Sequence, residues 1–121
     1  MTTENLPVLA ILGGTGDLGT GLARRWAQVG YEVIIGSRTQ EKAEAAVADL
    51  REVMAERGVA EISVRAMENL AAARAADIVT LTVPFSHQAS TLELVKEALH
   101  GKILIDVTVP LVPPKVARVQ L

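Results

Sequence analysis

A glycine-rich stretch at residues 13–19, GGTGDLG, constrains the fold of this chain more than any other segment. Its last three glycines are spaced as G-x-G-x-x-G, which allows a tight turn, a close approach of backbone to phosphate and close packing of a helix on a strand. The apolar run at residues 8–12 precedes it as a buried strand would, and apolar residues follow at helical spacing, at Leu18, Leu22, Trp26 and Val29. We therefore predict a strand–loop–helix unit that holds the pyrophosphate of a dinucleotide.

The loop and the first turn of the helix supply the predicted contacts to this ligand. Free N–H groups and the positive end of the helix dipole favour an anion at that point. The predicted cofactor-binding residues are Gly14, Thr15, Gly16, Asp17, Leu18 and Gly19. A tight turn without a ligand is the competing interpretation. Asp17 fits a carboxylate that complements the dipole better than it fits a catalytic acid.

The composition of the 121-residue chain is that of one folded domain, residues 1–121. Half of the residues are apolar but only 2% are aromatic, which fits a core of Val, Ile, Leu and Ala between helices and a parallel sheet. The formal charge of −2 gives no broad attraction to nucleic acid or to an anionic membrane, so we expect neither as a partner. The absence of cysteine excludes disulfides and cysteine-ligated metals, and we predict no metal site. The start of the chain lacks the segments of a secretory signal, so we expect a cytoplasmic protein.

Strand and helix patterns alternate along the chain. Strands are predicted at residues 8–12, 31–36, 62–66, 78–83 and 103–107. Right-handed β-α units of this kind predict an α/β, Rossmann-type, doubly wound parallel sheet in the order 3-2-1-4-5, with three layers and a ligand crevice between strands 1 and 4. After strand 5 the fold looks truncated, because prolines at 110, 113 and 114 exclude a regular helix or a central strand.

Three helix starts are predicted from residues that commonly act as N-caps. Thr39 is expected to cap a helix over residues 40–57, Asn69 a short helix to Ala75, and Ser86 the helix before Gly101. The side chains of the long helix that are spaced to face the sheet are Ala43, Val47, Leu50 and Met54.

The end of the second strand indicates which dinucleotide is bound. NAD-binding versions of this unit place an acidic residue there for the ribose hydroxyls, whereas this chain has Gly36-Ser37-Arg38-Thr39. Arg38 offers a bidentate guanidinium to a 2′-phosphate, Ser37 and Thr39 offer hydroxyls, and Lys42 adds a second charge one turn later. These four residues predict NADP(H). The alternative is that Arg38 and Lys42 are solvated surface charges and that Ser37 only caps a turn.

These motifs together closely resemble the NADPH-dependent F420 reductase family, also called F420-dependent NADP oxidoreductases, over nearly the whole chain. The matching segments are the GGTGDLG loop, the IIGSR strand end with its Lys-, Ala- and Glu-rich helix, the turn Val83-Pro84-Phe85, and residues 107–111. The resemblance implies direct hydride transfer between coenzyme F420, as co-substrate, and the nicotinamide of NADP(H). It assigns positioning roles to Thr15, Pro84 and Phe85, with Val83 and Pro84 also near the cofactor, and no catalytic acid, nucleophile or metal.

The resemblance also implies parts that this sequence does not contain. Family members continue into segments that complete the deazaflavin site and contribute to dimer contacts, so we expect a homo-oligomer, NADP(H) binding, and no efficient F420 reduction by these residues alone. His87 follows the turn and either faces the crevice or is exposed to water. Two other functions remain open, a non-catalytic NADP-binding redox sensor and a fragment of an imine or ketone reductase.

Overall fold

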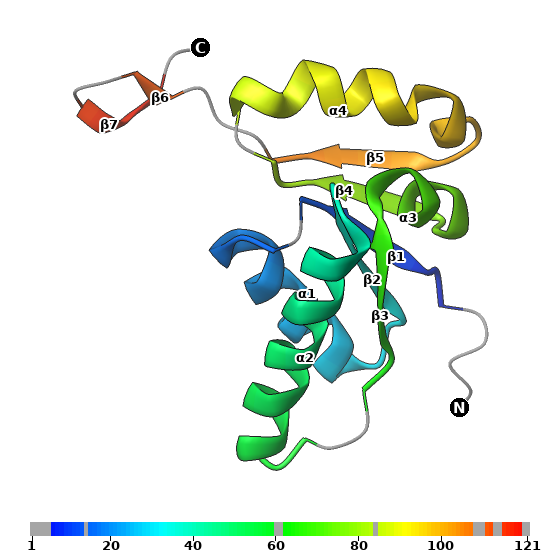
Figure 1. The fold of residues 1–121 in the computed structure, drawn as a ribbon, viewed down its shortest axis with the longest axis vertical. Helices are drawn as coiled ribbons and strands as arrows, with labels where there is room; N and C mark the ends of the chain where they lie inside the picture. The colour runs from blue at the N-terminus through cyan, green and yellow to red at the C-terminus, as the bar shows by residue number, and fades with distance from the viewer. Residues whose placement is uncertain are drawn as a thin grey trace.

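A computed structural model of the chain describes residues 6–13, 15–59, 62–83, 85–107, 111–112 and 115–119. Its strands are β1 (Leu9–Leu12), β2 (Val33–Ser37), β3 (Val64–Glu68), β4 (Ile78–Leu81) and β5 (Ile103–Asp106). Its helices are α1 (Asp17–Val29), α2 (Gln40–Glu56), α3 (Asn69–Ala75) and α4 (Gln88–Val95), with short 3-10 turns η1 (Phe85–His87) and η2 (Lys96–Leu99) on either side of α4. The five strands form one parallel sheet in the order β3-β2-β1-β4-β5, which confirms the predicted Rossmann-type topology (Figure 1).

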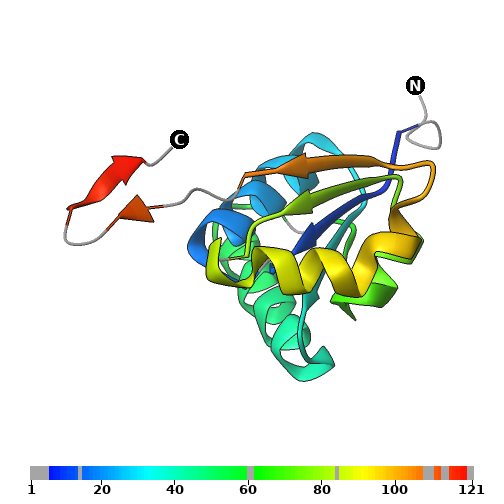
Figure 2. The same cartoon turned by 90° about the horizontal axis from the view of Figure 1, so that it is seen from above.

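Two apolar clusters form the core, one on each face of the sheet. Successive side chains of a strand point to opposite faces, so Leu12 of β1 belongs to one cluster and Ile11 to the other. The buried residues of α3 and α4 complete the first cluster, and those of α1 and α2 complete the second. Helices therefore cover both faces (Figures 1 and 2). Every residue of β1 is buried, as expected for the central strand of a parallel sheet.

Helix α2 begins and packs as its sequence predicts. The Thr39 hydroxyl accepts a hydrogen bond from the Lys42 amide at 3.2 Å, which confirms Thr39 as the N-cap. The four side chains predicted to face the sheet are all buried: Ala43, Val47, Leu50 and Met54.

Helix α1 packs on the sheet with only part of the apolar set that its spacing indicates. Leu18 and Val29 are 53% and 73% exposed, whereas Ala23 and Ala27 are buried against the sheet. Gly19 is also buried. Small residues let α1 approach the strands closely, while Leu22 and Trp26 are partly buried and pack against the same cluster. The spacing therefore predicts the helix and two of its four apolar contacts.

Two predicted caps are wrong, and the bounds of the third strand are shifted at both ends by two residues. Asn69 is the first residue of α3 and does not cap it, because its side chain bonds to a distant part of the chain, as described below. Ser86 lies inside η1, so α4 begins at Gln88 with His87 in the cap position and no side-chain cap. The third strand spans Val64–Glu68 rather than residues 62–66, because its pairing with β2 begins at Val33 and Val64.

The last strand of the sheet leaves apolar side chains uncovered. Ile103 and Ile105 of β5 are 61% and 41% exposed. Their register with Ile78 and Thr80 places them on the face of the sheet that α1 and α2 cover elsewhere. The following residues include a separate antiparallel pair, β6 (Leu111–Val112) and β7 (Lys115–Val119), while the prolines named above lie outside the described residues. In the part of the chain that the structure describes, none of the helices has the length and apolar character needed to cross a membrane.

Candidate functional site

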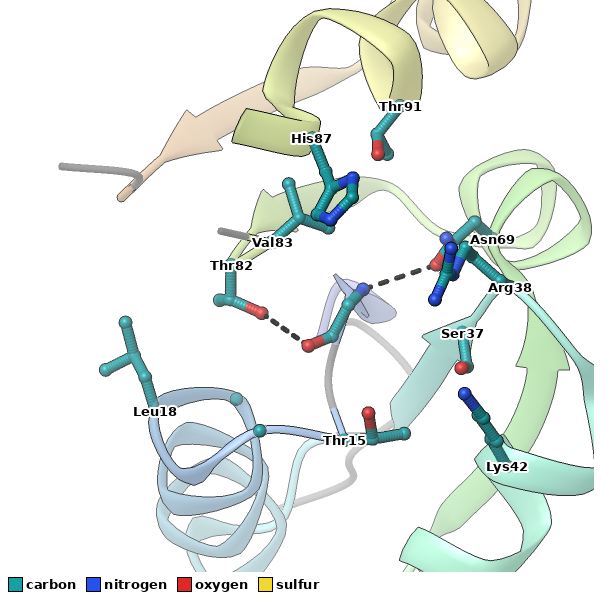
Figure 3. Close-up of a pocket in the computed structure, with 13 residues that line it drawn as sticks. Thr15, Leu18, Ser37, Arg38, Lys42, Asn69, Thr82, Val83, His87 and Thr91 are labelled. Carbon is teal, nitrogen blue, oxygen red and sulfur yellow. Dashed lines mark hydrogen bonds between the residues drawn. The ribbon is translucent and has the colours of Figure 1, made fainter. Parts of the chain in front are cut away.

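A cavity of about 460 Å³ opens at the carboxyl edge of the sheet, where β1, β2 and β4 end. This is the point at which the chain order of the strands changes direction, and ligands of open α/β sheets bind at such points. Its size falls within the range of roughly 300–1,000 Å³ that is typical of small-molecule sites. Figure 3 shows its walls, which come from the glycine loop, the start of α2 and the segment after β4.

The glycine loop and the N-terminus of α1 form one wall of the cavity. Four of the predicted residues line it: Thr15, Gly16, Leu18 and Gly19. Gly16 occupies the N-cap position and, having no side chain, leaves the first-turn N–H groups of α1 uncapped. A Cβ built on Gly16 meets nothing within 4 Å, so the space beside it is open. The α1 terminus is therefore available to an anion, in contrast to that of α2, which Thr39 caps.

The end of β2 and the first turn of α2 form a basic wall. Ser37 is buried, while Arg38 and Lys42 are exposed, and all three line the cavity (Figure 3). In the described residues, neither Arg38 nor Lys42 has a carboxylate within ion-pair distance. Two cations that lack a counter-charge in the described part of the chain thus line a cavity whose other wall is a helix N-terminus.

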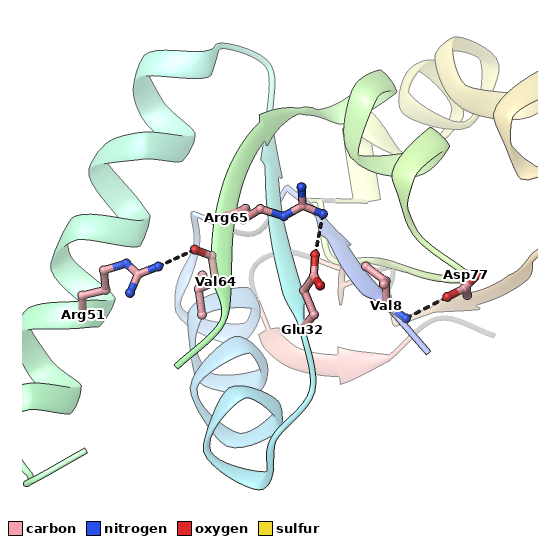
Figure 4. A network of polar contacts seen from close by, with 6 residues as sticks. All are labelled: Val8, Glu32, Arg51, Val64, Arg65 and Asp77. Atoms are coloured by element: carbon pink, nitrogen blue, oxygen red, sulfur yellow. Dashed lines mark hydrogen bonds and ion pairs between the residues drawn. The ribbon is translucent and has the colours of Figure 1, made fainter. Parts of the chain in front are cut away.

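The opposite edge of the sheet differs, because protein groups pair with one another there (Figure 4). Asp77 accepts a hydrogen bond from the Val8 amide at 2.8 Å, and Arg65 forms an ion pair with Glu32. Arg51 donates to the Val64 carbonyl at 2.7 Å. The amino ends of the strands are therefore held by internal contacts, whereas Arg38 and Lys42, which have no carboxylate partner among the described residues, lie at the carboxyl edge.

The segment after β4 closes the cavity on the side away from α2. Val83 and His87 both line it, and Figure 3 shows the His87 ring pointing from η1 toward the cavity. His87 is nevertheless exposed, so the two placements considered for it are both partly correct. Thr39 is not among the lining residues, and its contact with a cofactor stays a prediction. Gly14 and Pro84 lie outside the described residues, as do the side chains of Asp17 and Phe85.

Four residues that line the cavity were not among the predicted site residues: Gly13, Asn69, Thr82 and Thr91. The Gly13 amide donates to Asn69 Oδ1 at 3.3 Å, and the Gly13 carbonyl accepts from Thr82 Oγ1 at 3.1 Å. No local pattern signals these contacts, because the partners are 56 and 69 residues apart in the chain. Among the described residues, no group of three His, Cys, Asp or Glu side chains is placed to hold a metal ion.

Comparison with known proteins identifies the family of the chain. A family model described as NADP oxidoreductase, coenzyme F420-dependent, matches residues 8–110. The chain belongs to this family. It is 52% identical over 103 residues to the F420-dependent NADP reductase of Methanothermobacter marburgensis, a match that covers 85% of this chain and 45% of that protein. The chain thus spans about half the length of the curated relative.

Solved structures of related proteins share the fold of this F420-dependent oxidoreductase family member. A crystal structure of a proposed F420-dependent NADP reductase from Arthrobacter sp. FB24 superposes with a TM-score of 0.70 at 28% identity, over 95% of this chain and 51% of that one. An imine reductase from Bacillus cereus gives a TM-score of 0.61 at 27% identity, over 86% of this chain and 32% of that one. In both comparisons the chain corresponds to about half or less of the solved protein.

Proposed function

We propose that this chain binds NADP(H) for hydride exchange with coenzyme F420. The observation that carries the proposal is that Arg38 and Lys42 line the same cavity as the uncapped N-terminus of α1. A helix N-terminus favours a pyrophosphate, and two unpaired cations at the end of β2 favour a 2′-phosphate. NAD lacks the 2′-phosphate and would leave these cations without a partner.

Each part of the cofactor has residues suited to it. The first-turn amides of α1 and the backbone at Gly16 suit the pyrophosphate, because Gly16 leaves room for close approach. The guanidinium of Arg38 offers a bidentate contact to the 2′-phosphate, with Ser37 and Lys42 beside it. When bound together, the nicotinamide and the deazaflavin supply the hydride chemistry themselves, and the protein supplies proximity and orientation.

Residues of the glycine loop and of the segment after β4 are proposed to position the nicotinamide. Thr15 and Val83 line the cavity, and Pro84 and Phe85 follow Val83 directly in the chain. We assign these four residues positioning roles, with His87 as a further candidate at the mouth of the cavity. None of these roles requires the side chain to transfer a proton.

Separate calorimetric titrations of the 121-residue chain with NADPH, NADH and F420 test this proposal. We expect NADPH to bind at least tenfold more tightly than NADH, because one charge-assisted hydrogen bond contributes about 1.5–3 kcal/mol. F420 binding would place the deazaflavin site within these residues, whereas NADPH binding alone would favour a cofactor-binding unit. Failure to bind NADPH would contradict the proposal.

We also propose that the chain self-associates through the uncovered face of β5. Ile103 and Ile105 are exposed side by side on an edge strand, which is a common association surface. We expect Ile105→Lys to lower the weight-average mass that sedimentation equilibrium measures at equal concentration, because a charge disfavours burial of this face. Val29→Lys, at an apolar residue on α1 that is 73% exposed and lies away from β5, is the control. An equal effect of both variants, or a monomeric unmodified chain, would contradict the proposal.

The remaining parts of the proposal concern partners and location. We expect a cytoplasmic protein, because NADP(H) is an intracellular cofactor and a cysteine-free chain is compatible with a reducing compartment. We expect small-molecule ligands and no nucleic-acid partner, since the formal net charge is −2. Cell fractionation with an antibody to the chain tests the location.

A further inference from the structure

Gly13 is the residue at which the chain leaves β1 and enters the glycine loop. Its φ of +71° lies in the left-handed region, which favours glycine. A Cβ at this position would meet Val83 Cγ1 at 2.4 Å, so the backbone of Gly13 lies directly against the segment after β4. The conformation of the loop therefore depends on how Gly13 is held.

Two side chains from distant segments hold Gly13 on opposite sides (Figure 3). Asn69 Oδ1 accepts a hydrogen bond from the Gly13 amide. The Thr82 hydroxyl shares its one proton between the Gly13 carbonyl, at 3.1 Å, and the Leu12 carbonyl, at 2.9 Å. The Thr82 amide also donates to the Leu12 carbonyl at 3.0 Å. The end of β1 and the first residue of the loop are thus tied both to the start of α3 and to the end of β4.

The position of Asn69 is itself determined by its surroundings. Asn69 is 3% exposed, and a buried amide is costly unless it is hydrogen-bonded. Gly36 of β2 leaves the space that Asn69 occupies, because a Cβ there would lie 2.8 Å from Asn69 Oδ1. The absence of a side chain at Gly36 is therefore a requirement for the contact between Asn69 and Gly13.

We propose that Asn69 and Thr82 are positioning residues that fix the glycine loop in its pyrophosphate-binding conformation before the cofactor arrives. The inference rests on the proposed NADP(H) function. A loop fixed in advance loses less conformational freedom when the ligand binds, so its affinity is higher. Both residues act through Gly13. They therefore contribute to binding of the pyrophosphate and not to binding of the 2′-phosphate at Arg38.

Thr82→Val is the variant that tests this role, and Thr82→Ser is its matched control. Valine keeps the shape of threonine but loses the hydroxyl, and serine keeps the hydroxyl. We expect Thr82→Val to weaken NADPH binding about three- to tenfold, the equivalent of one neutral hydrogen bond. Binding of adenosine 2′-monophosphate, which lacks the pyrophosphate, should change less than twofold, and Thr82→Ser should restore NADPH binding to within twofold.

Amide exchange of the ligand-free protein separates positioning from direct contact with the cofactor. By NMR, the Gly13 amide should exchange at least fivefold faster in Thr82→Val and in Asn69→Leu than in the unmodified chain, because the loop opens more often. Equal losses of NADPH and adenosine 2′-monophosphate binding, or unchanged exchange at Gly13, would overturn the positioning role. If the unmodified chain binds neither ligand, the proposed function fails as well; if it binds both and the variants do not discriminate between them, only the positioning role fails.

Discussion

Arg38→Ala is expected to reduce the affinity for NADPH about ten- to a hundredfold and to leave the affinity for NADH unchanged. The guanidinium lines the cavity and has no carboxylate partner in the described residues, so its removal affects the ligand rather than an internal ion pair. One charge-assisted hydrogen bond is equivalent to about 1.5–3 kcal/mol, which sets this range. Calorimetric titration of each cofactor measures the effect.

Two further variants make the Arg38 test specific. Arg38→Lys keeps the charge but loses the bidentate fork of the guanidinium. Its affinity for NADPH should therefore fall between that of the unmodified chain and that of Arg38→Ala. Arg57→Ala removes the same charge at the far end of α2, a helix of 17 residues and about 25 Å, and should change neither affinity. An unchanged ratio of NADPH to NADH affinity in Arg38→Ala would show that Arg38 is only a solvated surface charge.

Gly13→Ala is expected to lower the free energy of unfolding by about 2–5 kcal/mol. A left-handed conformation costs a non-glycine residue about 1–2 kcal/mol, and overpacking adds about 1–3 kcal/mol. The overpacking arises because the new methyl group would lie 2.4 Å from Val83 Cγ1 and 3.1 Å from the Val83 backbone nitrogen. Valine has little freedom to rotate away, since it is β-branched. Urea unfolding measures the loss.

Gly101→Ala is the matched control for the effect of backbone conformation alone. Gly101 has a φ of +75°, close to that of Gly13, and a Cβ there meets nothing within 4 Å. We expect this variant to lose only about 1–2 kcal/mol. The difference between the two losses in free energy of unfolding measures the cost of the contact with Val83. Equal losses in the two variants would mean that the loop moves away from Val83 without cost.

The fold was predictable because its signals are local. The buried run before the glycine loop, the β-branched run at residues 78–83 and the cap at Thr39 each reflect a backbone preference that neighbouring residues determine. Right-handed crossovers then leave few arrangements of five parallel strands, and the observed order β3-β2-β1-β4-β5 is the one predicted. The buried face of α2 followed from spacing for the same reason.

The support of the loop was not predictable, because it depends on tertiary contacts. Asn69 has the residue type and sequence position of an N-cap, but its side chain bonds to Gly13 from 56 residues away. In α1, close packing favours Ala23 and Ala27 at the sheet and leaves Leu18 exposed, a choice that hydrophobicity alone does not indicate. The sequence therefore predicted the residues that line the cavity better than the groups that hold the loop in place.

The ratio of NADPH to NADH affinity for the unmodified chain tests the central claim most directly. Both cofactors carry the same pyrophosphate, which we assign to the N-terminus of α1, and they differ only in the 2′-phosphate, which we assign to Ser37, Arg38 and Lys42. We predict that NADPH binds at least tenfold more tightly at low salt, and that the preference narrows as salt screens the exposed cations. Equal affinities, or a preference for NADH, would contradict the assignment of this cavity to NADP(H).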